Sequence, residues 1–188
     1  MKRSVLLALS VALVAVGVLA ACSKGSTSFN DADVTFVKHM IPHHEQAVAM
    51  ARTVESNASS AEVKTLAGRI EKAQAPEIEK MKSWLKSWGK PETPATGSDM
   101  SNMDRGKSMG MGIMSADEMD KLRSLRGAAF DKQFLSMMIK HHQGAIEMAK
   151  TELNDGEDKD AKAMAQDIIK AQETEITRMQ SLLVTAAK

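Results

Sequence analysis

Apolar and polar residues recur with helical spacing along most of the chain after residue 29. In the first such stretch Val34, Val37, Ile41 and Val48 are separated by three, four and seven positions, which places them on one face of an α-helix. Asn30 precedes this pattern and has the side chain of a helix cap. The pattern therefore predicts an amphipathic helix that begins near Asn30–Asp31.

Three further long helices are predicted by the same reasoning. The sequence Ser59-Ser60-Ala61-Glu62 has the form of a capping box and starts a helical pattern that runs toward Trp88, before Gly89. Two more patterns cover residues 128–153 and 158–187, and the turn-like segment 154–156 separates them.

An internal duplication organises these helices. Residues 36–85 align with residues 134–183 without a gap, and 20 of the 50 aligned pairs are identical. The period of 98 residues is too long for a solenoid. Each copy contains two helices, so the sequence predicts an all-α protein, with two duplicated helical hairpins packed as a four-helix bundle over residues 30–188.

Residues 89–114 between the copies have the composition of a linker, and Ser115 starts a second capping box that predicts a short helix. The linker is rich in methionine, and its thioethers are candidates for the mobile capture of a soft metal ion, with a simple flexible tether as the alternative. These candidate capture residues are Met100, Met103, Met109, Met111 and Met114.

The N-terminus has the features of an export signal, in which Lys2 and Arg3 precede an apolar run and small residues. Residues 1–21 resemble a bacterial lipoprotein signal, so Cys22 is predicted to carry the lipid, with residues 22–29 as a tether. The alternatives are ordinary secretory cleavage, which would leave a free thiol, and an uncleaved anchor.

Composition narrows the classes of function. The chain has no tyrosine and only four phenylalanines, but 15 methionines, which agrees with an all-helical protein. Without residues 1–21 the chain keeps 23 basic residues against 24 acidic ones, so it has no basic surface for nucleic acid. Lipidation of Cys22 would leave no thiol for a disulfide or for catalysis.

The phrase Met-Ile-x-His-His occurs once in each copy, and all five histidines lie in or beside these two stretches. Residues four apart share a helix face, so each helix presents imidazole and thioether groups together. This mixture of soft and borderline ligands favours Cu(I), with other transition metals as alternatives. The candidate metal ligands are His39, Met40, His43, His44, Met50, Met137, Met138, His141, His142 and Met148.

Each of these residues also has an ordinary structural interpretation, because a methionine on an apolar face usually fills the core and a histidine pair is often a surface feature. A di-iron centre of the ferritin type is less well supported, since no Glu-x-x-His motif occurs. Four polar residues form two identical pairs at aligned positions of the two copies. They either belong to a polar helix face or form hydrogen bonds with imidazole N–H groups. They are Gln74, Glu77, Gln172 and Glu175.

Over residues 29–185 the sequence resembles the domain-of-unknown-function 305 family, and the duplicated Met-Ile-x-His-His phrase carries this resemblance. The resemblance implies a ferritin-like four-helix bundle in an exported bacterial protein, and some relatives are linked to copper binding. It assigns the family motif to the two histidine pairs and to Met40, Met50, Met138 and Met148. His39 is matched by Met137, so the two halves are not expected to contribute equally.

Together these patterns predict a lipid-anchored protein on the extracytoplasmic face of a bacterial membrane that sequesters or transfers Cu(I), with a metal donor or acceptor protein as partner. Two alternatives remain open. One is a metal-dependent oxidase with a ferritin-like core, and the other is a structural or interaction bundle that binds no metal.

Overall fold

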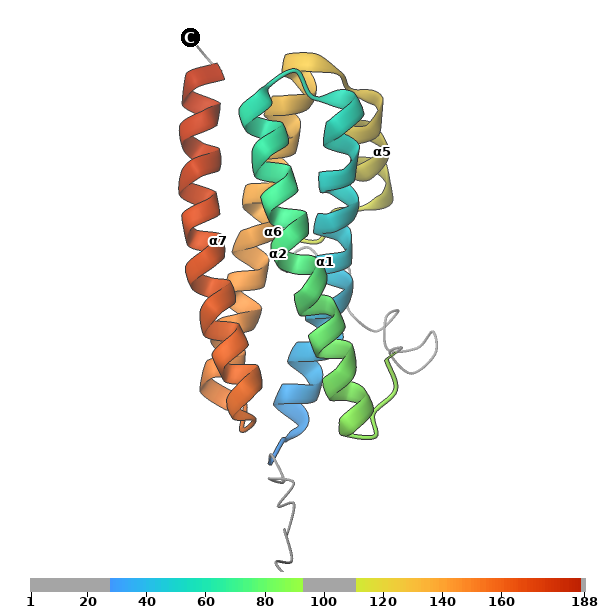
Figure 1. The fold of residues 1–188 in the computed structure, drawn as a ribbon, viewed down its shortest axis with the longest axis vertical. Coiled ribbons are helices and arrows are strands. Elements are labelled where there is room, and N and C mark those ends of the chain that lie inside the picture. Colours follow the sequence, from blue (N-terminus) through green and yellow to red (C-terminus); the bar gives the residue numbers. More distant parts are fainter. Residues whose placement is uncertain (1–27, 93–110, 187–188) are drawn as a thin grey trace, which may run out of the picture.

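The computed structural model describes residues 28–92 and 111–186. Four long helices run up and down the molecule, and a short fifth helix lies beside the upper half of the first (Figure 1). They are α1 (Asp31–Asn57), α2 (Ala61–Ser87), α5 (Ala116–Ser124), α6 (Gly127–Asp155) and α7 (Lys159–Ala186). The expected all-α, ferritin-like four-helix bundle is confirmed.

The helix boundaries agree closely with the capping signals. Asn30 caps α1 and forms a capping box with Asp33, and Ser115 forms one with Glu118 at the start of α5. The cap of α2 is Ser60, whose side chain accepts a hydrogen bond from the backbone N–H of Val63. This helix starts one residue later than a cap at Ser59 would place it.

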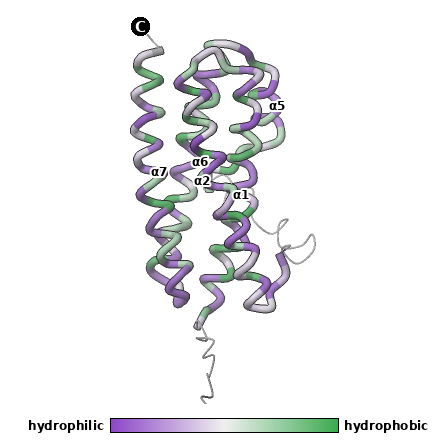
Figure 2. Tube along the Cα trace, in the orientation of Figure 1, coloured by the Kyte–Doolittle hydropathy of each residue, from purple (hydrophilic) through white to green (hydrophobic). Residues whose placement is uncertain are grey.

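The two hairpins are α1 with α2 and α6 with α7, and they pack on each other mainly through α1 and α6. Helices α1 and α6 run in opposite directions, since α1 rises and α6 descends in the view of Figure 1. Figure 2 shows hydrophobic and hydrophilic residues interspersed along every helix, as amphipathic helices require. The antiparallel pair brings the two copies of the duplicated phrase to the same height in the bundle.

The buried apolar residues form two separate clusters, one in each half of the bundle. The upper cluster contains residues 50–54 of α1, 130–138 of α6 and the buried face of α5. The lower cluster contains residues 34–41 of α1, 78–85 of α2 and 145–149 of α6, together with Val48. The histidine pairs lie on α1 and α6 at the level where the two apolar clusters meet.

The expected linker is described only at its two ends. Residues 93–110 lie outside the described residues, and so do the candidate capture residues Met100, Met103 and Met109. The predicted signal and Cys22 also lie outside them. None of the described helices is long and apolar enough to cross a membrane.

Candidate metal centre

The four paired histidines converge in the middle of the bundle, and all four side chains are 0% exposed. The rings of His43 on α1 and His141 on α6 are in direct contact, with 3.7 Å between their centroids. The neighbouring rings, His44 and His142, lie 6.4 Å from His43 and His141 respectively. Two segments that are 98 residues apart in sequence thus form one layer of imidazoles.

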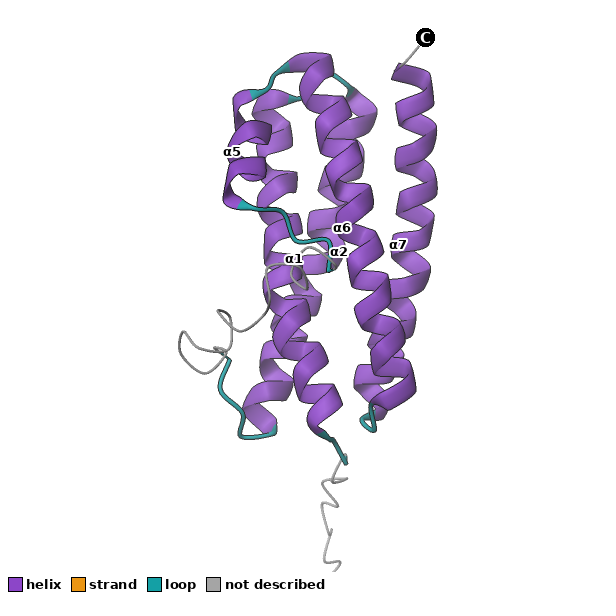
Figure 3. Ribbon diagram, turned by 180° about the vertical axis from the view of Figure 1, so that it is seen from behind, coloured by secondary structure: helices purple, strands orange, loops and turns teal. Residues whose placement is uncertain are grey.

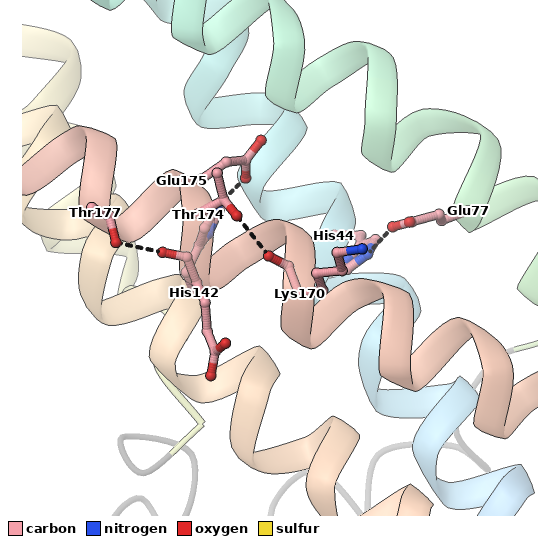
Figure 4. Close-up of polar contacts among 8 residues, drawn as sticks. His44, Glu77, His142, Lys170, Thr174, Glu175 and Thr177 are labelled. Atoms are coloured by element: carbon pink, nitrogen blue, oxygen red, sulfur yellow. Dashed lines mark hydrogen bonds and ion pairs between the residues drawn. The ribbon is translucent and has the colours of Figure 1, made fainter.

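Each outer histidine is held by a glutamate from the second helix of its own hairpin. His44 Nε2 lies 2.7 Å from Glu77 Oε2 on α2, and His142 Nε2 lies 2.6 Å from Glu175 Oε2 on α7. Figure 4 shows these pairs on either side of the bundle. A carboxylate only accepts hydrogen bonds, so each Nε2 carries a hydrogen and the neutral ring keeps its lone pair on Nδ1.

A backbone carbonyl holds His43 in the same orientation. His43 Nε2 lies 2.9 Å from the carbonyl oxygen of Met111, in the segment that precedes α5. The carbonyl is an acceptor, so this ring also keeps its lone pair on Nδ1. The Nδ1 atoms of His43, His44 and His142 are buried and have no hydrogen-bond partner among the described residues.

His141 is the exception, because neither of its ring nitrogens has a hydrogen-bond partner among the described residues. A buried polar group without a partner costs about 1–3 kcal/mol. No described residue compensates this cost, and a ligand bound between the rings would remove it.

The environment keeps the inner rings neutral. Burial, followed by the nearby His44 ring, lowers the pKa of His43 to about 3. Burial and the neighbouring His43 ring also lower the pKa of His141 well below its usual value. A metal binds the neutral imidazole, so these two rings are ready to bind one at pH 7 without losing a proton first.

The segment 111–114 crosses the bundle at the height of the histidines and leads into α5 (Figure 3). Its close approach to α6 depends on two glycines. Gly112 has a φ of +71°, and a Cβ there would collide with the backbone of Lys140. A Cβ on Gly144 would collide with the carbonyl of Met111. Glycine at both positions therefore allows this close approach, because a larger residue would force the crossing segment and α6 apart.

Gln46 fixes the far end of the crossing segment to α1. Its side-chain amide donates to the carbonyl of Met114 and accepts from the backbone N–H of Met114, both at 2.8 Å. Gln46 and Gly144 are matched positions of the duplication. One copy has glutamine and the other glycine, so the two halves of the bundle contact the linker differently. This mismatch is visible in the sequence, but was not used in the sequence analysis.

Most of the candidate methionines lie in the two apolar clusters that flank the histidine layer. Met40 is fully buried in the lower cluster, and Met50, Met137 and Met138 belong to the upper cluster. Met114 is buried there as well, whereas Met111 is partly exposed. Thioether side chains therefore occur in both clusters, above and below the layer of imidazoles.

His39 and Met148 lie elsewhere, on the lining of a surface pocket. The side chain of His39 is half-buried, and burial followed by the charge of Lys38 lowers its pKa. Met148 is partly buried and packs against the lower cluster. The structure therefore places these two candidates at the surface, outside the fully buried group of four histidines.

Gln74 and Gln172 are both buried, and they occupy the same level of the bundle on α2 and α7. Both amide atoms of Gln74 and the side-chain oxygen of Gln172 lack a hydrogen-bond partner among the described residues. No three side chains of histidine, cysteine, aspartate or glutamate within residues 28–92 and 111–186 are arranged to hold one ion together. The candidate ligands are instead the four imidazoles together with the thioethers of the flanking clusters, a combination that suits a soft ion.

Comparison with known proteins identifies the family. The family model of the domain of unknown function (DUF305) matches residues 33–183. A putative secreted DUF305 protein from Streptomyces coelicolor is 33% identical, covers 83% of this chain and 94% of that chain, and has a TM-score of 0.75. The chain therefore belongs to the DUF305 family, as its duplicated phrase predicted.

Two further relatives are informative. The structure of CopM in the Cu(I)-bound form is 31% identical, covers 81% of this chain and 96% of that chain, and has a TM-score of 0.66. CopM is also similar in its Cu(II)-bound and Ag-bound forms. An uncharacterized protein, L153, from Acanthamoeba polyphaga mimivirus is 45% identical over 62 residues, which are 32% of this chain and 41% of that protein.

Proposed function

We propose that this chain is an extracytoplasmic, lipid-anchored copper-binding protein that sequesters or transfers Cu(I). Four buried histidines form its binding layer, and His43 and His141 are the inner ligands. Met40 and Met138 supply thioethers from the apolar clusters on either side. Copper is the cargo of this protein, and it comes from or passes to a partner protein outside the cytoplasm.

The observation that carries this proposal is the set of orphaned imidazole nitrogens in the bundle core. Five buried ring nitrogens of the four histidines lack a hydrogen-bond partner among the described residues. The structural similarity to CopM, which is known in Cu(I)-bound form, supports copper as the ion. Glu77 and Glu175 orient the outer rings from the side opposite Nδ1, as partners of metal ligands do.

The anchor and the location are parts of the same proposal. The lipoprotein-like sequence before Cys22 supports attachment to a membrane, and the similarity to a secreted protein supports a location outside the cytoplasm. Mass spectrometry of the membrane fraction tests the anchor, because it detects a lipid-modified Cys22 at the N-terminus. A mature chain without that mass would contradict the anchoring but not the copper site.

The binding site is tested by anaerobic competition with bathocuproine, a Cu(I) chelator. The protein is expected to retain Cu(I) against the chelator, and replacement of His43 and His141 by leucine is expected to abolish this retention. Gln143→Ala is the matched control, since Gln143 is exposed beside His142 on α6. Equal retention by the histidine variant and the wild type would refute the site.

A further inference from the structure

A pocket of about 360 Å³ opens on the lower half of the bundle, between the start of α1 and the end of α6. His39 on α1 and Met148 on α6 both line it, so an imidazole and a thioether from different hairpins face one space. Both side chains are partly exposed. This space is therefore reachable from solvent, unlike the central histidine layer.

The inner wall of the pocket contains a buried carboxyl group. Glu152 lines the pocket and its side chain is only 1% exposed. Burial and the neighbouring carboxyl group of Asp33 raise the pKa of Glu152 to about 8. The soft and borderline ligands that this pocket offers are therefore the thioether of Met148 and the imidazole of His39.

The duplication provides an internal comparison for this pair. His39 and Met148 correspond to Met137 and Met50 of the other half. Met137 and Met50 are both buried in the upper cluster, together with Met119 of α5. The same two positions are therefore sealed under α5 in one half and open to solvent in the other, where an imidazole replaces one thioether.

The open pair also lies next to the central layer. His39 is one helical turn before His43, about 6 Å along the axis of α1, and on nearly the same face of the helix. An ion held at His39 is thus one turn away from the inner imidazoles of His43 and His141.

We propose that His39 and Met148 form a second site, open to solvent, that binds a soft monovalent cation and passes it to the histidine layer. The binding part of this proposal stands alone, and only the transfer rests on the proposed function. The pocket takes a cation such as Cu(I) or Ag(I), because one thioether and one imidazole provide soft and borderline ligands.

Ag(I), which is not oxidised in air, serves as the probe, and the ¹³C-labelled methionine methyl groups of the full chain report its binding by NMR. The Met148 methyl resonance, assigned with Met148→Leu, is expected to shift during the titration. Met164 is the control, since it is partly buried against the same lower cluster but does not line the pocket. An unchanged Met148 resonance would overturn the proposal.

Substitutions at His39 separate ligation from packing. His39→Leu is expected to remove one bound equivalent of Ag(I) and the shift of Met148. His39→Met recreates the residue of the sealed half and is expected to keep both. A Met148 shift that persists in His39→Leu would show that the imidazole is not a ligand and would overturn the paired site.

Variants of the inner layer distinguish this site from the proposed function. In the double variant His43→Leu with His141→Leu, the shift of Met148 is expected to remain while the equivalent bound at the layer is lost. If the double variant lost the Met148 shift as well, the second site would not be independent and would be refuted. If the double variant lost nothing, the central site would be refuted and the open site retained.

Discussion

Replacement of His141 by leucine tests whether the imidazole layer is built for binding rather than for stability. His141 is fully buried, and neither of its ring nitrogens has a hydrogen-bond partner among the described residues. Each unsatisfied buried group costs about 1–3 kcal/mol, and leucine is similar in size but has no polar atoms. His141→Leu is therefore expected to raise the unfolding free energy of the metal-free protein by about 1–3 kcal/mol.

The assay is thermal unfolding of the metal-free and Cu(I)-loaded protein under anaerobic conditions. For a domain of this size a change of 1 kcal/mol moves the Tm by roughly 2–4 °C, so the metal-free variant is expected to melt higher. Wild-type protein with free Cu(I) at 100 times the Kd should gain about 2.7 kcal/mol, and His141→Leu should lose this gain.

His142→Leu is the matched control on the same helix. It removes the hydrogen bond between His142 and Glu175, so it is expected to lower the stability of the metal-free protein. Opposite signs at two adjacent buried histidines would show that the hydrogen bond to Glu175 stabilises the fold at His142, whereas His141 has no such bond among the described residues. If His141→Leu lowered the stability as His142→Leu does, His141 would not be an unsatisfied core residue. If it kept the Cu(I)-dependent gain, His141 would not be a ligand.

Three other substitutions test the surroundings of the layer. Gly144→Ala would place a Cβ against the carbonyl of Met111 and is expected to lower the unfolding free energy by about 1–3 kcal/mol. Urea unfolding measures this change, and an unchanged midpoint would contradict the close approach of the crossing segment to α6. Glu77→Ala leaves the Nε2–H of His44 without its acceptor and is expected to weaken Cu(I) binding about 10–100-fold in the chelator competition. An unchanged affinity would show that Glu77 does not orient the His44 ring for binding. Burial and the adjacent Asp33 raise the pKa of Glu152 from 4.5 to about 8, so wild-type stability should fall as the pH rises from 4.5 through 8. Glu152→Gln should flatten this fall, and parallel stability curves would contradict the raised pKa.

The sequence predicted the architecture because each of its signals is local. Helical periodicity and the caps at Asn30 and Ser115 depend on neighbouring residues, and the structure confirms the helices that they predicted. The duplication predicted two similar hairpins, which the helix contacts also confirm. The convergence of His43 and His141 needed one further fact, the antiparallel packing of α1 on α6, which no local pattern provides.

Other features of the site depend on contacts between distant segments. The bond from His43 to the carbonyl of Met111 involves the backbone of the linker, so the identity of the linker residue gives no signal. The position of His39 in a surface pocket, beside Met148, depends on how α1 packs against the end of α6. In the sequence, the crossing segment is indicated by the mismatch of Gln46 with Gly144 in the duplication, because both residues contact this segment.

The buried acidic pair at the lower end of the bundle was also missed. Asp33 accepts hydrogen bonds from the backbone N–H groups of Asn30, Glu157 and Asp158, and so joins the start of α1 to the start of α7. In sequence Asp33 is only the third residue of a capping box, where an exposed carboxylate is expected. Its burial beside Glu152 arises from the docking of one hairpin on the other.

A crystal structure of the Cu(I)-loaded protein, with anomalous diffraction recorded at the copper edge, shows where the copper binds. We expect an anomalous peak between α1 and α6 at the level of His43 and His141. Copper found only on the outer surface of a fully loaded protein, with no metal at the four central imidazoles, would contradict the proposed site.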